Sequence, residues 1–140
     1  MQRSNMKQYT GFKSALVIMI LFISPLADAA KKSNWKRGRI YYRMVCTDCH
    51  VNEAGGKITP AEKTKAEWAD YFEKNLHGPQ DAPKKFAASY FVSREYRESI
   101  KDTNRAAAKL LKIPDDQLLE DVRSFLIHRA KDSDQPSRCE

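Results

Sequence analysis

Apolar residues recur every three or four positions along most of the chain, which is the spacing of amphipathic helices. Trp68, Phe72 and Leu76, for example, are each four residues apart. A second apolar group shares one helical face near the end of the chain: Leu118, Val122, Phe125 and Leu126. No segment alternates apolar and polar residues for long enough to predict a β-strand. The pattern therefore predicts an all-α fold.

The first predicted helix runs from about Trp35 to Cys46. Gly38, Tyr42 and Cys46 follow one another at intervals of four residues, so they lie on the same face of this helix. Glycine destabilises a helix by about 1 kcal/mol, so its presence needs a reason. We expect another helix to cross closely at Gly38. The alternative is that Gly38 belongs to a loop.

The second predicted helix has recognisable start and stop signals. Thr59 is a capping residue, Pro60 suits the first helical position, and Glu62 completes a capping box. The segment His77–Pro79 ends the helix, because glycine is common just past a helix end and proline cannot continue a helix. On an ideal helix His77 would point about 180° from Trp68, so this helix must end or bend before His77.

Three further helices are predicted in the second half of the chain. Apolar spacing favours one over about residues 86–100 and a short one over about residues 104–112. Pro114 and Asp115 open the last helix, which reaches about Ala130. The polar residues after it are expected to form an extended tail.

Residues 1–29 have the three-part pattern of a secretory signal peptide. Three basic residues come first: Arg3, Lys7 and Lys13. An apolar run over residues 15–23 and an A-x-A cleavage pattern at residues 27–29 follow. A membrane anchor is the weaker alternative, because Pro25 ends the run well short of the about 20 apolar residues that span a bilayer.

Removal of the signal peptide would leave one domain over residues 30–140, without a membrane span, in the periplasm of a bacterium or outside the cell. Three basic residues and one acidic residue would be lost, so the formal net charge would fall from +7 to +5. A mildly basic surface favours redox partner proteins with acidic docking surfaces, or an anionic membrane face. Charges of both signs are interspersed, so nucleic-acid binding is not expected.

Cys46-Thr47-Asp48-Cys49-His50 is a C-x-x-C-H sequence, the attachment signature of c-type haem. Two cysteines three positions apart lie within one helical turn, so both sulfur atoms can reach the two vinyl groups of one haem. The histidine that follows then stands over the iron. We expect one covalent haem c, with thioether bonds from Cys46 and Cys49 and an iron–nitrogen bond from His50.

Three other kinds of site can contain a C-x-x-C pair. A thioredoxin-like redox motif would require a βαβ context, and no strand is predicted here. A structural zinc site would require four ligands, whereas His77, His128 and Cys139 are scattered. A disulfide within the pair would leave the adjacent His50 unexplained. Haem attachment is therefore the leading interpretation.

The chain resembles the class I monohaem cytochromes c over most of residues 30–140. Gly38, Tyr42 and the C-x-x-C-H sequence are similar to the first helix of that family. Residues 116–130 are similar to its last helix, which crosses the first. The resemblance implies a small helical domain wrapped around one haem, and a function in electron transfer.

The departure from that family concerns the sixth iron ligand. Class I cytochromes normally supply a methionine downstream of the motif, and no methionine follows His50 here. The methionines of the chain are Met1, Met6, Met19 and Met44. The remaining candidates are His77, His128 and Cys139, or an open sixth position. Methionine ligation raises the potential of a haem, so we expect a comparatively low potential.

His77 is the preferred sixth ligand, because histidine is the commonest metal ligand and the loop after this helix can fold over the distal side of a haem. The simpler alternative is a histidine that complements the dipole at a helix end. His128 is less favoured because it lies about 120° from the centre of the apolar face of its helix. Cys139 is less favoured because little holds a residue so near the chain end.

Bis-histidine ligation by His50 and His77 predicts an electron carrier rather than an enzyme. No combination of general acid, base and nucleophile is apparent in the sequence. Ligation by Cys139 would instead predict a thiolate-ligated haem enzyme of sulfur metabolism. An open sixth position would predict a haem-based sensor of a gas or of redox state.

Overall fold

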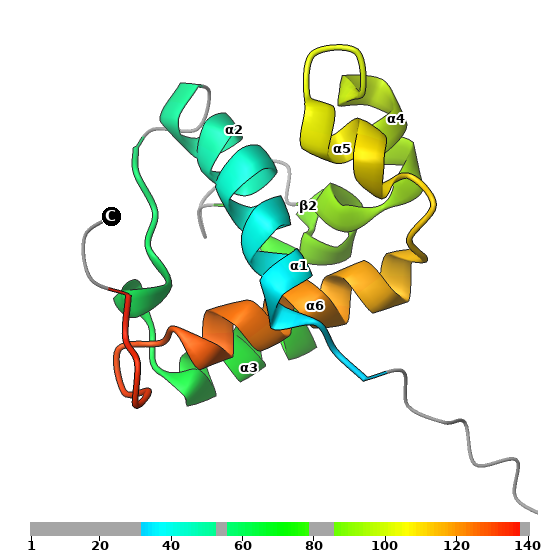
Figure 1. Cartoon of the computed structure of the whole chain (residues 1–140). Coiled ribbons are helices and arrows are strands. Elements are labelled where there is room, and N and C mark those ends of the chain that lie inside the picture. Colours follow the sequence, from blue (N-terminus) through cyan, green and yellow to red (C-terminus); the bar gives the residue numbers. More distant parts are fainter. Residues whose placement is uncertain (1–31, 53–55, 79–85, 138–140) are drawn as a thin grey trace, which may run out of the picture. The chain divides into compact units, whose positions relative to one another are not determined.

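The computed structural model describes residues 32–52, 56–78 and 86–137 (Figure 1). The predicted signal peptide, residues 1–29, and Cys139 lie outside the described residues. Within the described ranges the chain is helical apart from one pair of two-residue strands, which confirms the all-α prediction. None of the helices in these ranges is long and apolar enough to cross a membrane.

Short helical elements make up most of the described chain. In chain order they are α1 (Trp35–Tyr41), the π-helical segment η1 (Tyr42–Cys46), α2 (Thr47–Asn52), the 3-10 turn η2 (Pro60–Glu62), α3 (Lys65–Lys74), the 3-10 turn η3 (Ala88–Val92), α4 (Arg94–Ile100), α5 (Arg105–Leu110) and α6 (Asp115–His128). The two strands, which pair antiparallel, are β1 (Leu76–His77) and β2 (Phe86–Ala87).

The first helix is one continuous rod made of α1, η1 and α2. Its junction residues, Tyr42 and Thr47, both have right-handed helical backbone angles. The rod therefore continues past the predicted end at Cys46 and reaches Asn52. Widened π-helical turns are frequent at functional sites, and this one ends on the first cysteine of the C-x-x-C-H sequence.

The first and last helices cross at Gly38, as the sequence predicts (Figure 1). Gly38 is buried, and a Cβ atom there would lie 2.9 Å from the backbone nitrogen of Val122 and closer still to the Asp121 carbonyl. Real Cβ atoms do not approach backbone so closely, so only glycine fits at this crossing. One turn further along, Tyr42 packs on Phe125 with the ring centres 5.3 Å apart.

A buried carboxylate fixes the polar side of the same crossing. Asp121 is fully buried and accepts hydrogen bonds from the Asn34 backbone nitrogen at 2.7 Å and from the Gln117 side chain at 3.1 Å. It also pairs with the Arg37 guanidinium, whose position in the sequence is 84 residues away. Breaking a buried pair leaves an uncompensated charge, so this network strongly favours one register of α1 on α6.

The hydrophobic core contains the predicted apolar face of the last helix. Its buried residues are Tyr41, Tyr42, Val45, Trp68, Ala88, Val92, Ala106, Ala107, Leu118, Val122, Phe125, Leu126 and Ala130. All four residues predicted to share a face on α6 are in this list, so that face is confirmed. Trp68 brings α3 to the core, and its indole nitrogen donates to the Pro60 carbonyl at 2.8 Å.

The predicted start of the second helix is wrong, because the α-helix begins after a second capping box and not at the first. Thr59 and Glu62 do form the predicted box, but it closes only the 3-10 turn η2. A second box follows, in which Thr64 caps α3 and the Glu67 carboxylate accepts from the Thr64 backbone nitrogen at 2.7 Å. The α-helix therefore begins at Lys65.

The predicted end of this helix is also wrong, because α3 stops at Lys74 and not at the segment His77–Pro79. Asn75 has a left-handed backbone conformation, with φ of 51°, which asparagine tolerates better than most residues. This residue turns the chain out of the helix. Leu76 therefore lies in β1 and is not part of the helical stripe, and the expectation that the helix ends before His77 is confirmed.

Asn75 also holds the returning chain against the end of α3. Its carbonyl accepts from the Ala88 backbone nitrogen at 3.1 Å, and its side-chain oxygen accepts from the Ser89 backbone nitrogen at 2.8 Å. In the strand pair, His77 lies opposite Phe86. His77 is thus held both by the end of α3 and by pairing with β2.

The region predicted as one helix over residues 86–100 divides into β2, η3 and α4. Ser93 makes the division, because its hydroxyl caps α4 by accepting from the Tyr96 backbone nitrogen at 3.1 Å. Arg97 is fully buried, donates to the Ile113 carbonyl at 3.0 Å and pairs with Asp115. These bonds tie α4 to the start of α6, and α5 and α6 lie where the last two helices are predicted.

Candidate functional site

The C-x-x-C-H sequence lies on the first helix, with Cys46 at the end of η1 and with Cys49 and His50 in α2. Both cysteines are partly buried and present as thiols. The helix is held in place by its crossing with α6 and by Asn104, whose side-chain amide donates to the Met44 carbonyl at 2.6 Å. The motif is therefore presented by a helix that is fixed to both α5 and α6.

Cys46 lies in an apolar environment. Burial, and to a lesser extent the neighbouring Cys49, raise the pKa of the Cys46 thiol to about 12. Three tyrosines that interact with Cys46 also have raised pKa values, mainly through burial: Tyr41, Tyr42 and Tyr71. In a thioredoxin-like site the pKa of the attacking thiol is lowered instead. The surroundings of Cys46 are therefore unlike those of a disulfide-exchange site.

The structure brings His50 of α2 and His77 of β1 together. The centres of their imidazole rings are 5.6 Å apart, and the ring planes meet at 90°. Two histidines that bind one metal ion from opposite sides, with metal–nitrogen distances of about 2 Å, have ring centres about 6 Å apart. The observed separation is therefore close to that of two axial ligands on one haem iron.

Tyr71 and Phe91 both contact the His77 ring. The Tyr71 hydroxyl oxygen is 2.5 Å from Nδ1 of His77, and the Phe91 ring centre is 4.5 Å from the imidazole centre. Burial lowers the pKa of His77, and the nearby His50 lowers it further. The neutral imidazole is the form that binds metals. The contact with Tyr71 is made by Nδ1 and leaves Nε2 as the other nitrogen of the ring.

The Tyr42 hydroxyl is a buried polar group without a hydrogen-bond partner among the described residues. Leaving such a group unpaired costs about 1–3 kcal/mol, and unpaired buried groups are rare in native proteins. Edge-to-face contacts also link the Tyr71 ring to Trp68, Phe72 and His77. This combination of aromatic surface and unpaired hydroxyl suits haem, a flat apolar ring with polar side groups.

Among the described residues, no group of three or more His, Cys, Asp and Glu side chains is placed to hold a metal ion. Haem iron needs only two ligands from the protein, because the porphyrin supplies four nitrogen atoms. In a haem protein, His50 and His77 would supply these two ligands.

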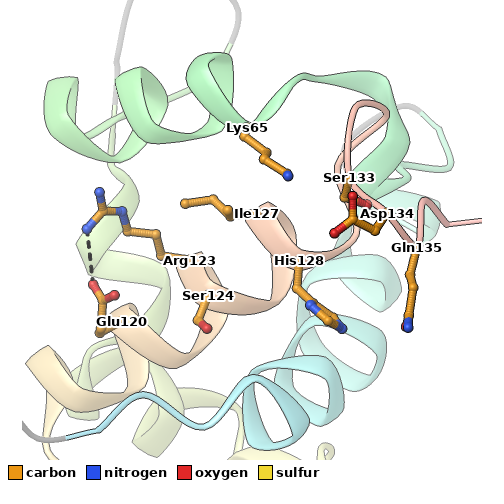
Figure 2. Close-up of a pocket in the computed structure, with 9 residues that line it drawn as sticks. All are labelled: Lys65, Glu120, Arg123, Ser124, Ile127, His128, Ser133, Asp134 and Gln135. Atoms are coloured by element: carbon orange, nitrogen blue, oxygen red, sulfur yellow. Dashed lines mark hydrogen bonds and ion pairs between the residues drawn. The ribbon is translucent and has the colours of Figure 1, made fainter.

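His128 lies elsewhere. Its ring packs on Trp35 at a tilt of 31°, with the centres 4.6 Å apart, and it lines a surface pocket of about 530 Å³ beside the segment after α6 (Figure 2). Trp35 begins the continuous first helix and His50 is near its other end, so a rise of 1.5 Å per residue separates them by about 20 Å. His128 is thus out of reach of an iron ion bound to His50.

The structure brings His77 close to His50, and the helix that carries His50 also carries Cys46 and Cys49. Ligation by Cys139 stays a prediction, because that residue is outside the described ranges. Sequence reasoning missed Tyr71 and Asn75. Asparagine is a known substitute for glycine where a helix ends in a left-handed residue, so the sequence did contain a signal for a helix end at Asn75. Nothing in the sequence indicates the contact between Tyr71 and His77.

No protein-family model, curated protein or solved structure matches this chain. The resemblance to class I cytochromes c therefore rests only on the residues of this chain that are similar to that family.

Proposed function

We propose that this chain is a single-haem c-type cytochrome that carries electrons. Cys46 and Cys49 would hold the haem through thioether bonds, and His50 and His77 would bind its iron. The observation that carries the proposal is the 5.6 Å separation of the two imidazole rings beside a C-x-x-C-H sequence. When bound, the haem supplies an iron ion that alternates between the ferric and ferrous states.

In this proposal the two cysteines retain the haem, and the surrounding structure limits how far the two histidine ligands move. Cysteine attachment keeps the haem from diffusing away in a compartment outside the membrane. The crossing of α1 and α6 fixes the helix that carries His50. The strand pair and the contacts with Tyr71 and Phe91 restrain His77. Ligands that stay in place in both oxidation states suit a protein whose task is to accept and donate one electron.

Ligation of the iron by a histidine on each side favours an electron carrier over a thiolate-ligated enzyme or a haem-based sensor. With His50 and His77 on the iron, no coordination position is open for a substrate or a gas. The thiolate-ligated enzyme of sulfur metabolism would need Cys139 in place of His77, and the sensor would need His77 to be absent from the iron. Histidine ligation without methionine also predicts a comparatively low reduction potential.

We assign the proposed cytochrome to the periplasm or to the outside of a bacterial cell, on the strength of the signal-peptide pattern in residues 1–29. The net charge of +5 that remains over residues 30–140 supports redox partners with acidic docking surfaces. Electron exchange with such partners should slow as ionic strength rises, because long-range charge steering is screened.

Expression of the full chain in a bacterium that exports and matures c-type cytochromes tests the proposal. The expected product begins near residue 30, retains one haem through acid–acetone extraction, and binds carbon monoxide only weakly in the ferrous state. His77→Ala should open the distal side to carbon monoxide, whereas the matched variant His128→Ala should not. Haem that extracts freely, or a response to His128→Ala alone, would contradict the proposal.

A further inference from the structure

Tyr71 is held in place at the end of α3. Its backbone carbonyl accepts the hydrogen bond from the Asn75 nitrogen at 3.1 Å that ends the helix. Its ring meets Trp68 and Phe72 edge to face, with ring centres 5.6 Å and 5.1 Å apart. The hydroxyl of this fixed side chain is 2.5 Å from Nδ1 of His77. Backbone and packing thus both aim the hydroxyl at one nitrogen of the proposed ligand.

The choice of nitrogen matters for metal binding. A neutral imidazole carries one proton, and only the other nitrogen can bind a metal. With Nε2 of His77 on the iron, Nδ1 would carry the proton and donate a hydrogen bond to the Tyr71 oxygen. The ordinary pKa of a tyrosine hydroxyl is about 10, so this group is a neutral hydroxyl at physiological pH.

Packing alone does not distinguish the two nitrogens. The Phe91 ring lies 4.5 Å from the His77 ring, and the Tyr41 hydroxyl donates to the Phe91 carbonyl at 2.5 Å, which holds that side in place. A phenyl ring limits how far the imidazole can swing. It cannot select between nitrogens of similar size, because it has no hydrogen-bonding group. The Tyr71 hydroxyl is the group that makes this distinction.

We propose that Tyr71 is a positioning residue, which holds Nδ1 of His77 and so sets the ring orientation that would present Nε2 to the iron. This inference rests on the proposed function. A hydrogen bond from Nδ1 also makes a histidine ligand more basic. A more basic ligand favours ferric over ferrous iron, so the Tyr71 hydroxyl should lower the reduction potential of the haem.

The holoprotein variant Tyr71→Phe tests this role, since it removes only the hydroxyl. Loss of a second-sphere partner commonly weakens metal binding about 10–100-fold. We therefore expect carbon monoxide to compete with His77 for ferrous iron about 10-fold more effectively, and the reduction potential to rise. Tyr90→Phe is the matched control, because the Tyr90 ring belongs to the same aromatic group, 5.4 Å from Phe91, without contacting His77. It should leave both quantities unchanged.

The outcomes separate this inference from the proposed function. If the parent protein lacks covalent haem, or if His77→Ala leaves its spectrum unchanged, both fail. If the parent has the expected haem and ligands but Tyr71→Phe alters neither carbon monoxide binding nor potential, only the role of Tyr71 is overturned. Proton NMR of the diamagnetic ferrous parent needs no variant. It should show the Nδ1 proton of His77 protected from exchange, and rapid exchange would overturn the role as well.

Discussion

The crossing of α1 and α6 and the segment around His77 are held by different kinds of interaction. At the crossing, Gly38 touches backbone, and the buried carboxylate of Asp121 has three partners in the described chain. Around His77, a pair of two-residue strands and contacts with Tyr71 and Phe91 hold the chain. The first region determines whether the chain folds, and in the proposed cytochrome the second would determine what can reach the iron. Variants should therefore affect stability and ligation separately.

The largest effect on stability is expected from Gly38→Val. A side chain there would displace the α6 backbone, so unfolding should become easier by about 3 kcal/mol or more, the upper range for overpacked sites. Chemical denaturation measures the change. Ala108→Val, at an exposed position of α5, is the control and should stay within about 0.5 kcal/mol of the parent. An unchanged melting temperature for Gly38→Val would place the crossing elsewhere.

Asp121→Asn should have the next largest effect. It leaves Arg37 without its buried counter-charge, and loss of one partner of such a pair costs about 3 kcal/mol. Asp70→Asn is the matched control, because Asp70 pairs with Lys74 at 2.8 Å on the exposed surface, where a pair contributes about 0.5 kcal/mol or less. Equal losses in the two variants would show that the Asp121 network does not fix the crossing.

Asn75→Ala should affect the segment around His77. Alanine in a left-handed conformation costs about 1–2 kcal/mol, and the bond to Ser89 is also lost. We expect a modest loss of stability together with faster carbon monoxide binding, because His77 is released. Asn75→Gly separates the causes: glycine restores the backbone conformation and most of the stability, but not the side-chain bond. If Asn75→Gly binds carbon monoxide no faster than the parent, the backbone alone positions His77.

Thr64→Ala should have the smallest effect. Loss of an N-cap hydroxyl costs about 1 kcal/mol. Hydrogen bonds from the Thr64 backbone and then from its hydroxyl hold the pKa of Glu67 below its ordinary value of 4.5. Glu67 therefore favours the folded state above that pH, and this contribution is lost as the pH falls below it. NMR titration should show a higher Glu67 pKa in Thr64→Ala, while Thr59→Ala, in the preceding box, should leave it unchanged.

Local patterns in the sequence predict much of this fold. The spacing of Leu118, Val122, Phe125 and Leu126 locates the buried face of α6, because burial on one side of a helix imposes that period. Gly38 predicts the crossing, because a glycine inside a helix needs a reason. The C-x-x-C-H sequence predicts Cys46, Cys49 and His50 as site residues, because haem attachment depends on their spacing within one helical turn.

Contacts between distant segments are not predicted in this way. The partners of Asp121 and of Arg97 belong to other elements, so no periodic pattern identifies them. The boundaries of α3 depend on which of two capping boxes leads into a helix and on the left-handed turn at Asn75. Tyr71 and His77 meet only because of that turn. The sequence therefore suggests His77 as a ligand but not the residue that orients it.

Near-infrared magnetic circular dichroism of the ferric protein tests the central claim most directly, because its charge-transfer band identifies the pair of axial ligands. Covalent haem bound by His50 and His77 predicts the band of two imidazoles, with no band from methionine or thiolate sulfur, and predicts that His77→Ala abolishes it. A sulfur-ligand band, or a two-imidazole band that survives in His77→Ala, would contradict the account.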